Sequence, residues 1–227
     1  MSVAVAIFVK TPGLSALKTR LWPNLGREAA ERLHMACAEA VASVVAEAGR
    51  RHGMTAYWAV AEENATAHWP GFPCVEQGAG SLGERMARVY RRMYERHGAA
   101  ILIGADAPQI EVRHLAEADA WLRAASAHLA IGPAEDGGFW LFGGNRRLDD
   151  TAWLQPRYSA PSTAVEFVEA LRGQGDWLEL ERLRDIDTVA DIGPVRERLA
   201  ALADATAEQS HLMEQLGRLD DIAERCA

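Results

Sequence analysis

The sequence contains few cysteines and none of the spacings that a metal site or a redox motif requires. Its three cysteines, Cys37, Cys74 and Cys226, are widely separated, and no Cys-x-x-Cys pair or Cys/His ligand spacing occurs. An odd number of distant thiols also argues against a disulfide framework. We therefore expect a reduced, cytoplasmic protein.

Long apolar runs and an excess of positive charge are also missing. No apolar run approaches membrane-spanning length, and the first one, at 3–9, lacks a basic leader and is too short for a signal peptide. The formal net charge of −8 argues against nucleic acid as a partner. The composition, 49% hydrophobic and 25% charged, is ordinary for a soluble globular protein, and 227 residues fit one α/β domain with a sizeable core. We expect neither a nucleic-acid nor a membrane partner.

Apolar runs typical of strands alternate with helical patterns along the chain. Strands are predicted at 3–9, 54–61, 99–103 and 128–131, with a further strand at 138–142 that could pair antiparallel with a neighbour and a late strand or extended segment at 177–183. Helices are predicted at 27–50, 81–97, 111–125, 161–171, 189–202 and 205–225. This alternation implies crossover connections and a mostly parallel sheet. The expected fold is a three-layer α/β/α, Rossmann-like domain over 1–203, followed by a helical tail at 204–227.

A cationic loop follows the first predicted strand. Its candidate phosphate-binding residues are Lys10, Thr11, Gly13, Lys18 and Arg20. The lysines supply point charges, whereas the guanidinium of Arg20 can grip a phosphate through two parallel hydrogen bonds. The Pro-Gly pair bends the loop and lets backbone N–H groups turn toward an anion. The pattern favours a polyphosphate site in an acidic protein. A solvated basic loop is the alternative, because the glycines of a Walker motif are missing.

Carboxylates follow two other predicted strands. Asp106 comes after the apolar run 99–103, and Asp136 comes after the run 128–131 and precedes Gly137 and Gly138. Opposite charges at the strand ends of an open α/β sheet form a site for a phosphate ligand with its metal, and Mg²⁺ prefers such hard oxygen ligands. A turn or helix-cap role for Asp106, and a turn at Asp136, are the alternatives.

Five segments carry a resemblance to a known family. They are Phe8-Val9-Lys10-Thr11-Pro12-Gly13, Lys18-Thr19-Arg20-Leu21, Gly104-Ala105-Asp106-Ala107-Pro108, Gly132-Pro133-Ala134-Glu135-Asp136-Gly137-Gly138-Phe139 and Asp185-Ile186-Asp187-Thr188. In this order they resemble the uncharacterised family usually called DUF2064, of GT-A-type nucleotide-diphospho-sugar transferase fold, whose members are commonly labelled glycosyltransferases. The chain is more distantly similar to guanylyltransferases and to the cytidylyltransferases that activate sugar acids. The resemblance extends from Val3 to about Leu199.

The resemblance implies a metal-dependent transferase that uses Mg²⁺ or Mn²⁺. Lys18 and Arg20 match the family's Lys-Thr-Arg-Leu core and, with Asp106, become candidate catalytic residues. The family gives Asp106 the role of a metal ligand. In the sugar-acid cytidylyltransferases the aspartate that matches Asp187 is also a metal ligand, so Asp106 and Asp187 would clamp one ion. A helix-capping role for Asp187-Thr188 is the alternative for that position.

The remaining candidates concern the acceptor and the type of reaction. Residues proposed to contact an acceptor or a sugar are Asp136, Gly137, Gly138, Tyr158 and Ser159. Asp136 could instead be a second metal carboxylate, and Ser159 could simply cap a helix. Nucleotidyl transfer from a nucleoside triphosphate to a small phosphorylated or hydroxyl acceptor is slightly favoured by the cationic loop. The alternatives are a glycosyltransferase that uses a nucleotide-sugar donor and a non-catalytic protein that binds a sugar nucleotide.

The tail carries its own pattern. Leu212, Leu216, Leu219 and Ala223 recur at three-to-four spacing within 205–225, and such an apolar stripe must be buried. It either docks on its own domain or packs against a second copy to form a homodimer.

Overall fold

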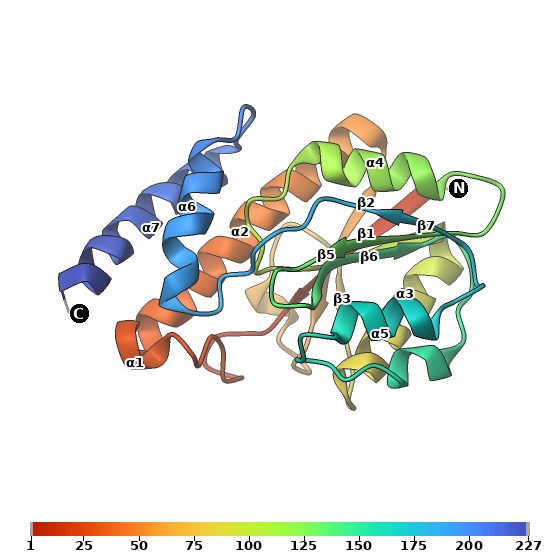
Figure 1. Cartoon of the computed structure of the whole chain (residues 1–227), viewed down its shortest axis with the longest axis horizontal. Coiled ribbons are helices and arrows are strands. Elements are labelled where there is room, and N and C mark those ends of the chain that lie inside the picture. The colour runs from red at the N-terminus through yellow and green to blue at the C-terminus, as the bar shows by residue number, and fades with distance from the viewer. Residues whose placement is uncertain (1, 226–227) are drawn as a thin grey trace.

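The computed structural model describes residues 2–225 and is built around a mixed sheet (Figure 1). In these residues the sheet has seven strands in the order β3-β2-β1-β4-β6-β5-β7. Only β6 runs antiparallel to its neighbours β4 and β5. The strands are β1 (Ser2–Val9), β2 (Thr55–Val60), β3 (Cys74–Glu76), β4 (Gly98–Gly104), β5 (His128–Pro133), β6 (Phe139–Gly144) and β7 (Asp176–Glu179). The predicted α/β fold class is confirmed.

Helices cover both faces of this sheet (Figure 1). Helices α2 (Arg27–His52) and α4 (Val112–Leu122) lie on one face, and α3 (Leu82–His97) and α5 (Thr163–Ala170) lie on the other. From Val3 to Val9 the central strand β1 is apolar, as expected for a strand that is buried on both sides. Val3, Val5 and Ile7 pack toward α2 and α4, whereas Ala4 and Ala6 pack toward α3.

Local signals in the sequence set some of the helix ends. Gly53 ends α2 with φ of 72°, in the left-handed conformation that glycine adopts without strain. The predicted capping box at the start of α3 is present, because the Ser81 hydroxyl accepts from the backbone of Glu84 and the Glu84 side chain accepts from the backbone of Ser81. The short elements α1 (Trp22–Leu25) and β3 are absent from the sequence-based prediction, and α5 begins two residues later than predicted.

A third apolar cluster lies where α2 packs against the two C-terminal helices. Helices α6 (Ile192–Ala200) and α7 (Ala207–Arg225) lie side by side against α2 (Figure 1). The stripe predicted in the tail faces this cluster: Leu212 and Leu216 are buried within their own chain, and Leu219 is partly buried. Cys226 lies outside the described residues, and the side chain of Ala223, the last position of the predicted stripe, lies outside the described side chains. Between residues 2 and 225 no helix combines the length and the hydropathy that a membrane crossing requires.

Candidate nucleotide site

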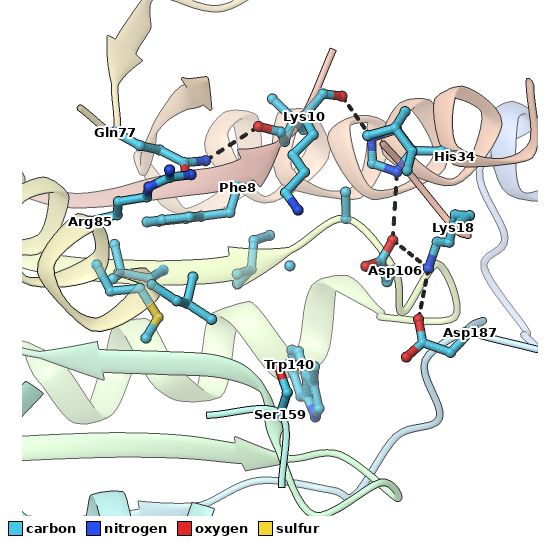
Figure 2. Close-up of a pocket in the computed structure, with 18 of the residues that line it drawn as sticks. Phe8, Lys10, Lys18, His34, Gln77, Arg85, Asp106, Trp140, Ser159 and Asp187 are labelled. Atoms are coloured by element: carbon cyan, nitrogen blue, oxygen red, sulfur yellow. Dashed lines mark hydrogen bonds and ion pairs between the residues drawn. The ribbon is translucent and has the colours of Figure 1, made fainter. Parts of the chain in front are cut away.

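A pocket of about 790 Å³ opens at the carboxyl ends of β1 and β4, where the sequence predicts the site (Figure 2). Most of its walls come from the loop after β1, the first turns of α3, and the loop after β4. Predicted site residues that line it are Lys10, Lys18, Arg20, Asp106, Asp136, Ser159 and Asp187. The topology thus brings together side chains from five separate segments.

The ammonium group of Lys18 lies between two carboxylates (Figure 2). Its Nζ is 2.8 Å from Asp106 Oδ1 and 3.2 Å from Asp187 Oδ1, and it also donates to the carbonyl of Ile186. The Lys18 side chain is 4% exposed, whereas each carboxylate is 40% exposed toward the pocket. Burial opposes the charge on Lys18, but the two carboxylates outweigh it and raise the pKa of the ammonium. Burial opposes ionisation of Asp106 too, and there the Lys18 charge prevails and lowers the pKa.

The backbone that presents Lys18 is in an uncommon conformation. Lys18 and Ser159 have φ of 47° and 58°, in the left-handed region, and both line the pocket. In the described part of the chain only one other non-glycine residue, Asn64, has positive φ. Buried Leu17 and Leu21 flank the loop and hold it in place. Strained residues of this kind persist where the surroundings fix them, which is typical of functional sites.

His34 links the two charged loops and was missed by the sequence analysis. It projects from α2, its Nε2 is 3.1 Å from the carbonyl oxygen of Lys10, and its Nδ1 is 3.7 Å from Asp106 Oδ1 (Figure 2). Because a carbonyl only accepts, Nε2 carries the proton in this arrangement. A histidine in the middle of an alanine-rich helix has no local feature that marks it as a site residue.

Several carboxyl groups lie close together around Lys18. Asp185, also missed by the sequence analysis, is close enough to the other aspartates that burial, and then the charges of Asp106 and Asp136, raise its pKa to about 8. The segments are tied together because the amide of Ile186 donates to the carbonyl of Asp106 over 3.0 Å. Asp191 takes the capping role that the sequence left open for Asp187. It accepts from the amides of Asp187 and Thr188, so the Asp187 carboxylate is left to the pocket.

These carboxylates do not form a complete metal cage. Among residues 2–225 no three His, Cys, Asp or Glu side chains are arranged to hold a metal ion, and the Lys18 ammonium lies between Asp106 and Asp187. Mg²⁺ is commonly held by one or two carboxylates and completed by substrate phosphates and water. The carboxylates of Asp106 and Asp187, each 40% exposed toward the pocket, therefore suit a divalent ion that arrives with a phosphate ligand.

Two residues of the predicted phosphate loop do not line the pocket. Thr11 is fully buried, its hydroxyl accepts from Trp69 Nε1 over 3.0 Å, and its amide donates to Glu62 Oε2 over 2.9 Å. Gly13 has φ of 79° with open space around it, so it serves the turn. Lys10 reaches into the pocket (Figure 2), and Arg20 is 68% exposed with a nitrogen 3.7 Å from Asp187 Oδ2.

The diglycine after Asp136 serves a turn and lies outside the pocket lining. A Cβ on Gly137 would come within 2.0 Å of the carbonyl oxygen of Pro161, and its φ is 89°. The amide of Gly138 donates to Asp136 Oδ1 over 2.8 Å, which is the local hydrogen bond of an Asp-Gly turn.

Tyr158, too, has a structural role rather than a place in the pocket. Its hydroxyl donates to the carbonyl of Trp153 over 2.7 Å, and its ring lies against Gly83 at the start of α3. Of the predicted acceptor residues, only Asp136 and Ser159 therefore line the pocket.

The other end of the pocket has a different chemistry. Phe8, Gln77 and Arg85 lie there, away from the carboxylates (Figure 2). Gln77 is buried, and its Nε2 donates to the carbonyls of Val9 and Ala59 at 3.3 and 2.8 Å. The Nε of Arg85 donates to the Gly80 carbonyl over 3.0 Å. A ring, an amide and a guanidinium together suit a planar, polar group such as a nucleobase.

The α/β fold is of the nucleotide-diphospho-sugar transferase-like type. The structure of a "putative nucleotide-diphospho-sugar transferase" from Desulfovibrio desulfuricans G20 is similar, with a TM-score of 0.84 and 23% identity over 97% of this chain and 98% of that one. A nucleotidyl transferase from Methanothermobacter thermautotroptrophicus gives 0.57 and 14% over 88% and 99%. CMP:2-keto-3-deoxy-manno-octonic acid synthetase complexed with CTP gives 0.52 and 15% over 88% and 99%.

The chain belongs to the family described as "Uncharacterized protein conserved in bacteria (DUF2064)", whose sequence model matches residues 33–159. The family predicted from the five sequence segments is therefore confirmed. No curated protein matches the chain. The similarity to the solved transferases establishes the fold that positions Lys18, Asp106 and Asp187 at one edge of the sheet.

Proposed function

We propose that the chain is a transferase that binds a metal–nucleotide in the Lys18 pocket and transfers the nucleotidyl group to a small phosphorylated or hydroxyl acceptor. The observation that carries this proposal is the buried Lys18 ammonium beside Asp106 and Asp187, with Lys10 and Arg20 in the same pocket. These cations suit a polyphosphate, and the carboxylates of Asp106 and Asp187 suit the ion that accompanies it.

The reaction would be an in-line displacement at the α-phosphorus of a nucleoside triphosphate. An acceptor oxygen forms a bond to this phosphorus while the bond to the β-bridging oxygen breaks. Pyrophosphate leaves with the electron pair, and a hydroxyl acceptor releases its proton to solvent. Arg20 would hold the phosphates, Lys18 would add positive charge beside them from between Asp106 and Asp187, and the Phe8–Arg85 end would hold the nucleoside. Mg²⁺ or Mn²⁺, when bound by Asp106 and Asp187, would neutralise charge on the phosphate oxygens.

Glycosyl transfer from a nucleotide-sugar is the second candidate. It is supported by the similar structure from Desulfovibrio desulfuricans, whose name refers to a nucleotide-diphospho-sugar transferase. In that reaction the acceptor attacks the anomeric carbon and a nucleoside diphosphate leaves. A non-catalytic protein that binds a sugar nucleotide is the third candidate, and turnover with any donor excludes it. The similar synthetase structure that contains CTP supports the first candidate.

A thermal-shift panel of nucleoside triphosphates and nucleotide-sugars, with and without Mg²⁺, tests the proposal. A ligand present at about 100 times its Kd stabilises the folded state by about 2.7 kcal/mol, which is roughly 5–10 °C in Tm for a chain of this size. We expect the largest shift with a triphosphate and Mg²⁺ together, and none for Asp106→Asn. The best donor is then incubated with extracts of small molecules. Release of pyrophosphate supports nucleotidyl transfer, release of nucleoside diphosphate supports glycosyl transfer, and no shift with any nucleotide contradicts the proposal.

A further inference from the structure

The loop that carries Asp106 is held by hydrogen bonds from a distant element. Residues 105–111 connect β4 to α4 and contain no helix or strand of their own. Gln209, in the first turn of α7, is 2% exposed, and its Nε2 donates to the carbonyls of Pro108 and Ile110 over 2.8 Å each. Two donors on one nitrogen therefore clamp two carbonyls of the same loop.

Helix capping explains only some of the hydrogen bonds that Gln209 makes. Its Oε1 accepts from the backbone N–H of Thr206 over 3.0 Å, and the backbone N–H of Gln209 donates to the Thr206 hydroxyl over 3.1 Å, as in a capping box. The Thr206 hydroxyl is also 2.7 Å from the Ser43 hydroxyl on α2. The cap needs no donor from Nε2, so the two bonds to Pro108 and Ile110 serve the loop.

The same loop is tied on its other side to the segment that carries Asp187. Gln109 is 2% exposed, and its Nε2 donates to the carbonyl of Arg184 over 2.7 Å. The backbone bond from Ile186 to Asp106 lies beside it. The separation of Asp106 and Asp187, and the place of Lys18 between them, thus depend on how the 105–111 loop is held.

We infer that Gln209 is a positioning residue for the candidate site, and that α7 is part of the scaffold that places Asp106. Gln209 does not line the pocket and acts through Pro108 and Ile110. Loss of its two donors leaves two buried carbonyls unsatisfied, and the loop relaxes to find other partners. Asp106 then shifts relative to Lys18 and Asp187. The ligand part of this inference rests on the proposed function, whereas the positioning part does not.

The test compares full-length variants that remain folded by far-UV circular dichroism. Gln209→Met keeps the length and removes both donors, and Gln209→Glu also keeps the acceptor that caps Thr206. Gln215→Met is the matched control, because Gln215 lies on the same helix and its Nε2 reaches only His211. Amide hydrogen exchange measured by mass spectrometry reports on the segments 105–111 and 184–187 without any ligand. Titration calorimetry with the best metal–nucleotide reports on the site.

We expect faster exchange in both segments for the two Gln209 variants and affinity at least about tenfold weaker, with neither change in Gln215→Met. Unchanged exchange in the Gln209 variants overturns the inference. Faster exchange with unchanged nucleotide affinity also overturns it, because Asp106 would then not depend on the clamp. If the wild-type chain binds no nucleotide, the proposed function fails, and the exchange data alone decide whether Gln209 positions the loop.

Discussion

At the scale of single residues, the pocket depends on the one buried ammonium of Lys18 and the two carboxylates around it. Removing one partner of a buried ion pair leaves the other charge without compensation. Lys18→Met should lower the free energy of unfolding by roughly 2 kcal/mol, less than for a fully buried pair because both carboxylates are 40% exposed. Urea denaturation measures the loss.

A second substitution makes this prediction specific. In Lys18→Met the Asp106 and Asp187 carboxylates repel each other without a cation between them. Adding Asp106→Asn removes one of the two charges, so the double variant should be more stable than Lys18→Met alone. If the double variant is instead less stable than Lys18→Met, the Lys18 ammonium does not neutralise the repulsion between Asp106 and Asp187.

Residue types and spacing predict the strand-end loops but not the direction of every side chain. Lys10 and Thr11 are neighbours after β1, yet Lys10 reaches into the pocket and Thr11 is buried against Trp69. Their orientation depends on packing with β2 and its loop, which no local pattern reveals. His34 was missed for a related reason, because only the tertiary fold brings α2 beside Asp106.

At the scale of elements, the turn between β5 and β6 sets the place of Asp136. The carbonyl of Gly137 accepts from the amide of Ala164 over 2.9 Å, so the turn docks on α5. Gly137→Ala should cost on the order of 2 kcal/mol or more, because its φ is 89° and the new Cβ meets backbone. Gly138→Ala is the matched control, since the atom nearest to its Cβ belongs to the Asp136 side chain, at 3.1 Å, and not to the backbone. Equal unfolding midpoints in urea for the two variants would contradict this account of the turn.

The start of α4 gives a prediction about pH. The amide of Glu111 donates to His114 Nδ1 over 3.0 Å, so this nitrogen must be unprotonated, while Nε2 lies 3.2 Å from Glu181 Oε2. Burial lowers the pKa of His114, although Glu181 opposes the shift and Arg113 adds to it. A folded-state pKa below the unfolded value of 6.5 means that this contribution to stability is present above pH 6.5 and is lost as the pH falls below it.

His114→Asn keeps an acceptor at that position and removes the titrating ring. Between about pH 7.5 and pH 5 the Tm of the wild-type chain should therefore fall further than the Tm of His114→Asn. Differential scanning calorimetry at several pH values measures both. Parallel Tm curves would show that protonation of His114 does not disturb the start of α4.

A helix or strand could be predicted when its own residues form a recognisable pattern, and could not when it depends on a partner strand. Strand β1 and helix α3 are readable because the first is continuously apolar and the second has both amphipathic spacing and a capping box. Strand β3 has only three residues and exists because β2 offers it a partner, so no period is long enough to reveal it. The late segment predicted at 177–183 forms a strand only over Asp176–Glu179, where β5 pairs with it.

At the scale of the whole molecule, the tail helix α7 completes the third apolar cluster, which it shares with α2 and α6. Leu212 and Leu216 are 1% and 0% exposed within a single chain, so the stripe that could have paired two copies is already covered. We expect the full chain to be a monomer by light scattering. A stable dimer that Leu219→Glu converts into a folded monomer would contradict this expectation and restore the homodimer alternative, because Leu219 is only partly buried.

The central claim is that a metal–nucleotide binds in the pocket between Lys18, Asp106 and Asp187. Titration calorimetry with the triphosphate that gives the largest thermal shift, in the presence of Mg²⁺, tests it most directly. We predict binding to the wild-type chain and to Asp204→Asn, an exposed aspartate used as the control, and loss of binding in Asp106→Asn and Asp187→Asn while both remain folded. Wild-type affinity in both site variants would contradict the account.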